Sequence, residues 1–155
     1  MNSNNIRWFC KYFDELDALT FHNIIQLRND VFIVEQDCHY RDLDGKDLQS
    51  HHVFGLNEKN EVVAHARLIP KGVSYEYVSI GRVVVRKDYR LTGLGHELMN
   101  YSMQKSKEIF GDEIIKIGAQ SHLQKFYNAH EFVTVSDIFL EDNIEHVYML
   151  YTPKQ

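Results

Sequence analysis

The sequence contains only two cysteines, Cys10 and Cys38, among its 155 residues. Two thiols are too few for a disulfide framework, and they lack the Cys-x-x-Cys spacing of many redox and zinc sites. The nine histidines are scattered, without a His-Glu-x-x-His motif. We therefore expect no bound metal and a location in the reducing cytoplasm.

Long apolar runs are also absent, because no run approaches the roughly twenty residues of a membrane span. The net charge is −5, and the lysines and arginines are scattered, so no basic face for nucleic acid is expected. The amino-terminal segment from Met1 to Asn5 lacks the basic and apolar regions of a signal peptide. Neither a membrane nor a nucleic acid is an expected partner.

No internal repeat, linker or low-complexity run divides the chain. At 155 residues, with 44% hydrophobic and 25% charged residues, the chain is long enough for one core and short for two. We therefore predict a single domain over residues 1–155.

The sequence alternates between strand patterns and helix patterns. Strands are predicted at residues 6–12, 52–56, 62–69, 75–86, 113–118, 132–139 and 146–151. Helices are predicted at residues 19–35, from the glycines near residue 93 to about residue 110, and at 122–129. The polar stretch 36–50 is expected to be a surface loop. This order predicts an α+β (mixed α/β) fold, a central mixed sheet with helices on both faces. The two strands that flank the second helix should pair in parallel.

One stretch organises the chain. The β-branched run from Ile80 to Val85 favours a buried strand, which ends at a charged corner, and Gly93 and Gly95 follow where a helix should begin. Thr92 is positioned to cap that helix, and the glycines would let an anion approach free backbone N–H groups. The alternative is a connection that needs glycine only for its dihedral angles. The P-loop and dinucleotide motifs do not fit, because the required Gly-Lys-Ser/Thr and third small residue are missing.

The turn reads Arg90-Leu91-Thr92-Gly93-Leu94-Gly95. This pattern resembles the coenzyme A motif of the GNAT-type N-acetyltransferases. Together with Ile80-Gly81-Arg82 before the turn and the segment from Gly118 to Tyr127 after it, the chain is similar to the ElaA-like branch over about residues 6 to 152.

This resemblance implies a GNAT-like acyl-CoA N-acyltransferase fold. The central strands beginning with Val83 and with Ile114 would splay apart and receive the pantetheine arm of acetyl-CoA, the cosubstrate. The residues that would bind it are Val83, Val84, Val85, Arg90, Leu91, Thr92, Gly93, Leu94, Gly95 and His96.

The resemblance also implies the reaction, transfer of an acetyl group to a primary amine of a small molecule, a protein lysine or an amino terminus. Tyr127 matches the tyrosine that protonates the departing sulfur; the alternative is a buried tyrosine that packs a short helix. Glu131 stands where the family usually has glycine before a phenylalanine. A glutamate costs about 1 kcal/mol there if the residue is left-handed.

The general base is less clear from the sequence. Many GNAT members have a glutamate where this chain has Ser79, which leaves Glu35, Asp44 and Asp47 as acidic candidates. We place Glu35 among the catalytic residues, and the choice of base among the three stays open. Asp44 and Asp47, with Arg67 and Arg82, are predicted to line the substrate site. The two arginines would either hold an acidic part of a substrate or pair with these aspartates, and we favour the ion pairs.

Two alternatives remain open within the same fold. Arg28, Phe32, Asp44, Asp47 and Arg67 are similar in type and spacing to the signature of acyl-homoserine-lactone synthases. The chain could also be a coenzyme A-binding module without turnover, which the departures at Ser79 and Glu131 permit. His65, on a predicted strand, is expected to be a packed histidine, and a homodimer is left open.

Overall fold

The computed structural model describes residues 5–154, so most of the segment without signal-peptide features, residues 1–4, lies outside the described residues. Two four-stranded sheets make up the fold. The first has the order β1 (Arg7–Tyr12), β2 (His51–Leu56), β3 (Val62–Ile69) and β4 (Ser79–Val85), all antiparallel. In the second, β8 (Ile144–Tyr151) pairs antiparallel with β5 (Ile115–Gln120), β6 (Phe132–Thr134) and β7 (Phe139–Glu141).

Three α-helices connect these strands: α1 (Ala18–Arg28), α2 (Leu94–Phe110) and α3 (Gln124–Asn128). The side chain of Asp17 caps α1 by accepting from the Thr20 N–H at 2.7 Å. A π-helical segment, η3 (Asn29–Glu35), continues α1, so the predicted helix over residues 19–35 is present in two parts. Single turns of 3₁₀-helix complete the chain, at η2 (Phe13–Glu15), η4 (Lys46–Gln49), η5 (Lys87–Tyr89) and η6 (Ser121–Leu123).

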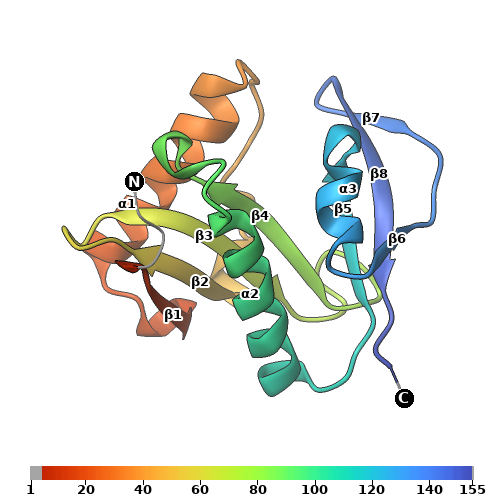
Figure 1. Ribbon diagram of the computed structural model, residues 1–155, viewed down its shortest axis with the longest axis horizontal. Coiled ribbons are helices and arrows are strands. Elements are labelled where there is room, and N and C mark those ends of the chain that lie inside the picture. The colour runs from red at the N-terminus through yellow and green to blue at the C-terminus, as the bar shows by residue number, and fades with distance from the viewer. Residues whose placement is uncertain (1–4, 155) are drawn as a thin grey trace.

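Helices cover both faces of the first sheet. Val53 packs in one core cluster with Leu98 and Met99 of α2, whereas its neighbour Phe54 packs in a second cluster with Ile24 of α1. Successive residues of a strand point to opposite faces, so α1 and α2 lie on opposite sides (Figure 1). All eight residues of β3 are buried, as expected for a strand covered on both faces.

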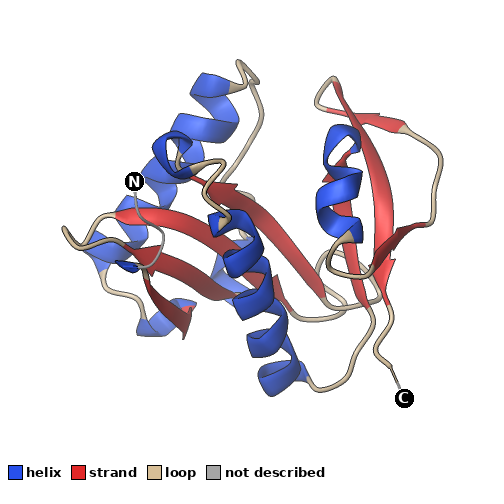
Figure 2. Cartoon of the chain, viewed as in Figure 1, coloured by secondary structure: helices blue, strands red, loops and turns tan. Residues whose placement is uncertain are grey.

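The two sheets touch at one place and then separate. Val78 and Ile115 form an isolated parallel bridge, and the Lys116 N–H donates to the Val78 carbonyl at 2.8 Å. Beyond it β4 and β5 diverge (Figures 1 and 2). The register between β3 and β4 shifts near Arg82, which has φ 49°, and such a bulge bends a strand. The parallel pairing predicted from sequence is therefore limited to one bridge, and the splay implied by the resemblance is confirmed.

Two predicted strands differ most from the structure in their bounds. Residues 71–77 form turns and bends, closed by a 2.7 Å hydrogen bond from the Gly72 N–H to the Tyr75 carbonyl, so β4 begins at Ser79. The predicted strand over residues 132–139 is broken into β6 and β7. At the break the hydroxyl of Ser136 accepts from the Tyr148 N–H at 2.8 Å, in place of a backbone acceptor.

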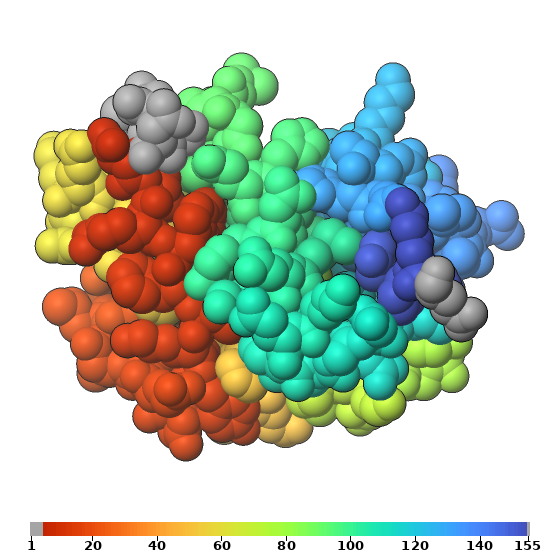
Figure 3. All heavy atoms as spheres, turned by 60° about the horizontal axis from the view of Figure 1, so that its bottom comes forward, coloured from red at the N-terminus to blue at the C-terminus, as the bar shows by residue number. Residues whose placement is uncertain are grey.

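The helix α2 lies over the seam between the sheets. In a view from below, its surface occupies the middle of the molecule, between the amino-terminal and carboxyl-terminal strands (Figure 3). Its side chains Leu94, Leu98 and Met99 belong to a core cluster that includes residues of both sheets. No helix in residues 5–154 has the length and apolarity needed to cross a bilayer.

Candidate active site

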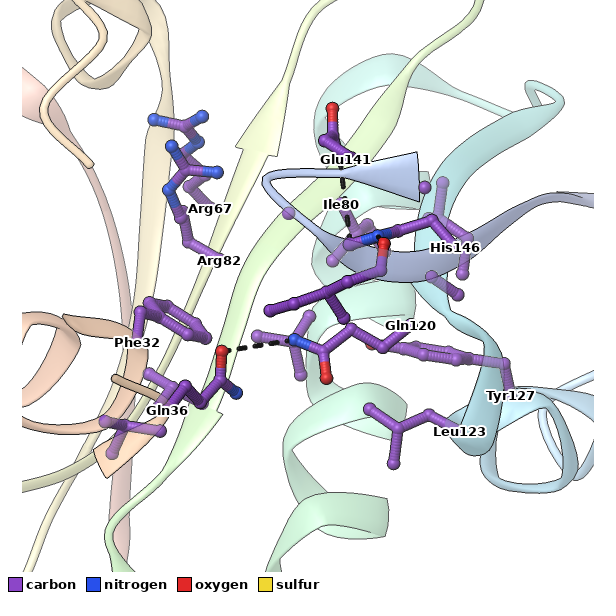
Figure 4. A pocket seen from close by; sticks show the side chains of 18 of the residues that line it. Phe32, Gln36, Arg67, Ile80, Arg82, Gln120, Leu123, Tyr127, Glu141 and His146 are labelled. Carbon is purple, nitrogen blue, oxygen red and sulfur yellow. Dashed lines mark hydrogen bonds and ion pairs between the residues drawn. The ribbon is translucent and has the colours of Figure 1, made fainter. Parts of the chain in front are cut away.

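The divergence of β4 and β5 opens a cavity of about 940 Å³. Its lining includes the glycine turn before α2, η3 with the following loop, and the β7–β8 turn. Two contacts bridge its walls. The Gln120 side chain donates to Gln36 Oε1 at 3.3 Å, and the Cys38 thiol donates to the Asp142 carbonyl at 3.5 Å. Figure 4 shows the glutamine pair crossing the opening.

Most of the predicted coenzyme residues line this cavity. Those that do are Val83, Val84, Val85, Arg90, Leu91, Gly93, Gly95 and His96. Thr92 and Leu94 do not. The Thr92 hydroxyl donates to the Tyr89 carbonyl at 2.6 Å, and the Leu94 side chain is buried in the core. The predicted capping role of Thr92 is therefore wrong, because Gly93 is the N-cap of α2.

The two glycines of the turn serve different needs. Gly93 has φ 86°, and a Cβ added there would meet no atom within 4 Å, so its side faces open space. A Cβ on Gly95 would lie 3.2 Å from the Phe126 ring, so this glycine allows the helix to pack. Among the described residues, no acceptor faces the N–H groups of Gly93, Leu94 or Gly95. Free N–H groups at a helix N-terminus attract an anion.

Tyr127 lies on α3 with its ring directed into the cavity (Figure 4). The ring packs edge-on against Phe126 and Phe132, at centroid distances of 5.0 and 6.0 Å. Burial raises the pKa of Tyr127, so the phenol is protonated at neutral pH. A protonated hydroxyl at a cavity wall has a proton to donate, but its raised pKa makes it a weaker acid than an exposed tyrosine. The same ring also packs the short helix.

The chain conformation after α3 agrees with the expectation for Glu131. This residue has φ 69°, in the left-handed region that favours glycine. Its carboxylate lies 2.8 Å from Lys154 Nζ in an exposed ion pair. The departure from glycine is therefore accommodated with backbone strain beside Phe132.

Glu35 lines the cavity but is paired. Its carboxylate accepts two hydrogen bonds from Arg90, at 2.5 and 3.0 Å. The bond from Arg90 lowers the pKa of Glu35 below its usual value. A carboxylate whose pKa is lowered is a weaker proton acceptor, and here Glu35 is paired with Arg90. Its catalytic role stays a prediction.

Comparison with known proteins identifies the family. The chain matches the family described as an acetyltransferase (GNAT) domain over residues 25–153. It is 36% identical to protein ElaA of Escherichia coli over 146 residues, covering 93% of this chain and 95% of ElaA. A UPF0039 protein of Schizosaccharomyces pombe is 39% identical over 147 residues, with coverage of 94% and 97%. The chain belongs to the GNAT acetyltransferase family.

Solved structures agree with this assignment. An acyl-CoA N-acyltransferase from Pseudomonas aeruginosa superposes with a TM-score of 0.90 at 36% identity, covering 95% of this chain and 99% of that one. The crystal structure of E. coli ElaA superposes at 0.88. The fold and the ElaA-like resemblance are confirmed, and the GNAT protein is an acyltransferase.

On the α1 side of the first sheet, six charged side chains of the GNAT protein form one ionic network: Arg28, Asp42, Asp44, Asp47, Arg67 and Arg82. Both oxygens of Asp47 accept from Arg28, at 2.6 and 3.2 Å. Both oxygens of Asp44 accept from Arg67, at 2.9 and 2.7 Å. Such bidentate pairs are the strong form of the arginine–carboxylate contact.

Asp42 links Arg28 to Arg82 within the ionic network, because it lies 3.0 Å from Arg28 Nε and 2.8 Å from Arg82 Nε. The ion pairs that we favoured for Arg67 and Arg82 are therefore present. Asp44, Arg67 and Arg82 line the cavity, whereas Asp47 lies behind it. Three positive and three negative charges cancel within the network, so its members are committed to one another.

The ionic network also accounts for the charged part of the pattern shared with acyl-homoserine-lactone synthases. Arg28, Asp44, Asp47 and Arg67 are all members, and Phe32 lines the cavity. A solved coenzyme A-dependent acyl-homoserine lactone synthase superposes with a TM-score of 0.75 at 15% identity. This likeness shows the fold alone.

Two further histidines differ in access. His65, expected to be packed, is fully buried and shares a 3.0 Å hydrogen bond with His52. Burial lowers the pKa of His65 well below its usual range, so it is neutral. His146 lines the cavity, together with Glu141. The sequence analysis did not identify His146 as a site residue, because His146 comes beside Gln120 only through the pairing of β8 with β5.

Proposed function

We propose that this GNAT protein transfers an acetyl group from acetyl-CoA to a primary amine, either of a small molecule or of a protein lysine or amino terminus. One observation carries the proposal: a single cavity runs from the free N–H groups before α2, past the separated edges of β4 and β5, to Tyr127. The helix N-terminus suits a pyrophosphate. The unpaired strand edges suit the amide groups of a pantetheine arm.

The proposed transfer needs a proton donor for the sulfur atom that leaves. As the amine nitrogen bonds to the thioester carbon, the carbon–sulfur bond breaks and the sulfur leaves as a thiolate. Tyr127 would donate its phenolic proton to that sulfur. By analogy with cysteine, whose pKa is about 8.5, the thiol is a fair leaving group, so this donation contributes modestly to the rate.

We also propose that residues 1–155 act as one catalytic domain in the cytoplasm. Both cysteines are free thiols, Cys10 partly buried and Cys38 buried, which supports a reducing compartment. Sizing the purified protein by light scattering distinguishes a monomer from the homodimer that the sequence leaves open.

A coenzyme A-binding module without turnover is the second candidate. It is favoured by Ser79, which stands where the family resemblance implies a glutamate, and by Glu35, which is paired with Arg90. Turnover separates the two candidates. Release of free thiol from acetyl-CoA in the presence of a panel of amines, polyamines, amino acids and peptides would support the enzyme.

Coenzyme binding is tested by thermal unfolding. At about a hundred times its dissociation constant, coenzyme A should stabilise the native protein by about 2.7 kcal/mol. Gly93→Val should abolish this shift, because the branched side chain enters the open space beside the free N–H groups. Gly72→Val is the matched control, since Gly72 has a similar φ of 89° with no atom near its Cβ position. An unchanged melting temperature of the native protein with coenzyme A would contradict both candidates.

A further inference from the structure

We propose that His146 is the general base of the transfer, which takes the proton from the acceptor nitrogen, and that Glu141 stabilises the imidazolium that forms. This inference rests on the proposed acyltransferase function. It assigns the one role that the predicted acidic candidates leave unfilled.

The backbone fixes the tautomer of His146. Its Nδ1 lies 2.7 Å from the carbonyl oxygen of Ile144. A carbonyl oxygen only accepts, so Nδ1 carries the hydrogen and donates it. The neutral ring then has its lone pair on Nε2, which is the atom that can take a proton.

The sheet directs this ring into the cavity. His146 pairs with Gln120 across β8 and β5, and paired residues project from the same face of a sheet. Gln120 forms the bridge to Gln36 across the opening, and His146 lies next to it (Figure 4). The ring is also stacked on Phe139 at 6.0 Å, which limits its rotation. His146 therefore presents Nε2 at the wall where the two sheets face each other.

Glu141 is placed to respond to protonation. Its Oε2 lies 3.6 Å from His146 Nε2, a distance at which two acceptors face each other while the ring is neutral. Once Nε2 takes a proton, the same geometry is an ion pair. The Glu141 side chain is 59% exposed, so the attraction is screened and modest.

Several elements place polar and charged groups around His146. Gln120 on β5 is uncharged, and Asp142 on the β7–β8 turn engages the Cys38 thiol through its backbone carbonyl. On the opposite wall, Arg67 and Arg82 are neutralised within the ionic network. Glu145, the neighbour in sequence, points to the other face of β8 and lies 3.5 Å from the Ser121 hydroxyl.

The acidic candidates and His65 are occupied or buried, whereas His96 and His122 also line the cavity, with His96 Nδ1 2.8 Å from His130 Nε2. Glu35 accepts two hydrogen bonds from Arg90, and Asp44 accepts two from Arg67. His65 is fully buried against His52 and does not line the cavity. Among the described residues lining the cavity, His146 combines an assigned lone pair, a fixed tautomer and a nearby carboxylate.

The step balances in atoms and protons. The neutral amine nitrogen bonds to the acyl carbon, and the nitrogen becomes acidic as it gains positive charge. His146 Nε2 takes its proton, the carbon–sulfur bond breaks, and Tyr127 protonates the sulfur. Solvent then carries a proton from His146 back to Tyr127. The net change is amine plus thioester to amide plus thiol, without any other reactant.

The variant His146→Asn tests this assignment, because asparagine can still donate a hydrogen bond toward the Ile144 carbonyl but has no basic nitrogen. We expect kcat to fall about a hundredfold, the low end of general-base effects. The thermal shift with coenzyme A should stay unchanged, and the fall of kcat/KM at acidic pH should disappear. His22→Asn, at an exposed position on α1, is the matched control and should behave as the native protein.

The role of Glu141 is tested by the pH profile of Glu141→Gln. Removing the negative charge disfavours the imidazolium, so the acidic limb of kcat/KM should move to lower pH. A limb that stays in place would show that Glu141 does not act on His146.

A measurement without any acceptor gives an independent test. In the protein saturated with coenzyme A, nitrogen-15 spectra of labelled histidine should show His146 as the Nδ1–H tautomer, with its signal assigned by its loss in His146→Asn. An Nε2–H tautomer, or native kcat and pH profile in His146→Asn, would overturn the base assignment while leaving the acyltransferase function standing. Absence of thiol release by the native protein with every amine would overturn both.

Discussion

The two walls of the cavity hold their ionisable groups in opposite ways. On the β4 wall, each carboxylate of the ionic network has an arginine partner, and Arg28 is completely buried. On the β5–β8 wall, Tyr127 has no hydrogen-bond partner among the described residues, and His146 keeps Nε2 unbonded. Paired charges fix geometry but resist proton exchange, whereas unpaired groups can exchange protons. The comparison separates a supporting wall from a reactive one.

The largest expected effect is a loss of stability on disrupting the ionic network of the supporting wall. Asp47→Asn removes one charge from between Arg28 and Arg67, leaving both guanidinium groups buried without full compensation. Breaking a buried pair in this way typically costs about 3–5 kcal/mol. Urea unfolding should show this loss, and Asp14→Asn, at an exposed site, should be close to neutral. A loss below about 1 kcal/mol would mean that the network contributes little.

The same variant changes the response to acid. Burial alone would raise the pKa values of Asp44 and Asp47, but hydrogen bonds and charge from Arg67 and Arg28 lower them. Their stabilisation is therefore fully present above the unfolded pKa of about 3.9 and is lost as the pH falls through the lower folded values. Native stability should decline steeply below about pH 4, and Asp47→Asn should decline less steeply.

The second effect is a loss of turnover at the reactive wall, without a change in fold. Tyr127→Phe should lower kcat about a hundredfold, because the leaving sulfur loses its proton donor. The thermal shift with coenzyme A should be unchanged, since the hydroxyl contributes little to binding. Single-turnover thiol release measures the rate. Loss of the coenzyme shift with kcat intact would demote Tyr127 to a packing residue.

A smaller effect tests whether Glu35 only pairs with Arg90 or acts as the base. If it serves only as the partner of Arg90, Glu35→Gln leaves kcat unchanged and frees a positive charge for the pyrophosphate. The KM for acetyl-CoA should then fall about two- to fivefold, as the ion pair is roughly a third exposed and worth under about 1 kcal/mol. A hundredfold loss of kcat would instead restore Glu35 as the base.

The smallest effect concerns the support behind Tyr127. Glu131→Gly relieves a left-handed residue, a strain of about 1 kcal/mol or more, but adds freedom to the unfolded chain. We expect a net gain of about 0.5 kcal/mol in urea unfolding, without change in kcat. Lys154→Ala removes the exposed ion pair alone and should be near neutral. Destabilisation by glycine would show that the ion pair outweighs the strain.

Much of the fold could be predicted because its signals are local. The β-branched run of β4, the glycines before α2 and the stripe on α1 each lie within one element, and their positions agree with the structure to within a few residues. The start of β4 was predicted too early because aromatic residues such as Tyr75 and Tyr77 favour strands, although here they follow the turn at Gly72.

The candidate site was predictable only in part. Local sequence specified the turn from Arg90 to Gly95 and, through a resemblance, Tyr127. It did not reveal that Arg90 would take Glu35, which is 55 positions away in the chain. Nor did it bring His146 beside Gln120, because that neighbourhood requires β8 to be inserted between β5 and β6.

The sequence by itself determined the family, the order of the elements and the turn before α2, since these depend on residue types close together in the chain. Only the tertiary structure decided which ionisable groups are paired and which can exchange a proton. Hydrogen bonds and ion pairs depend on distances of about 3 Å through space. The bulge near Arg82 and the splay of β4 from β5 set those distances for residues far apart in sequence.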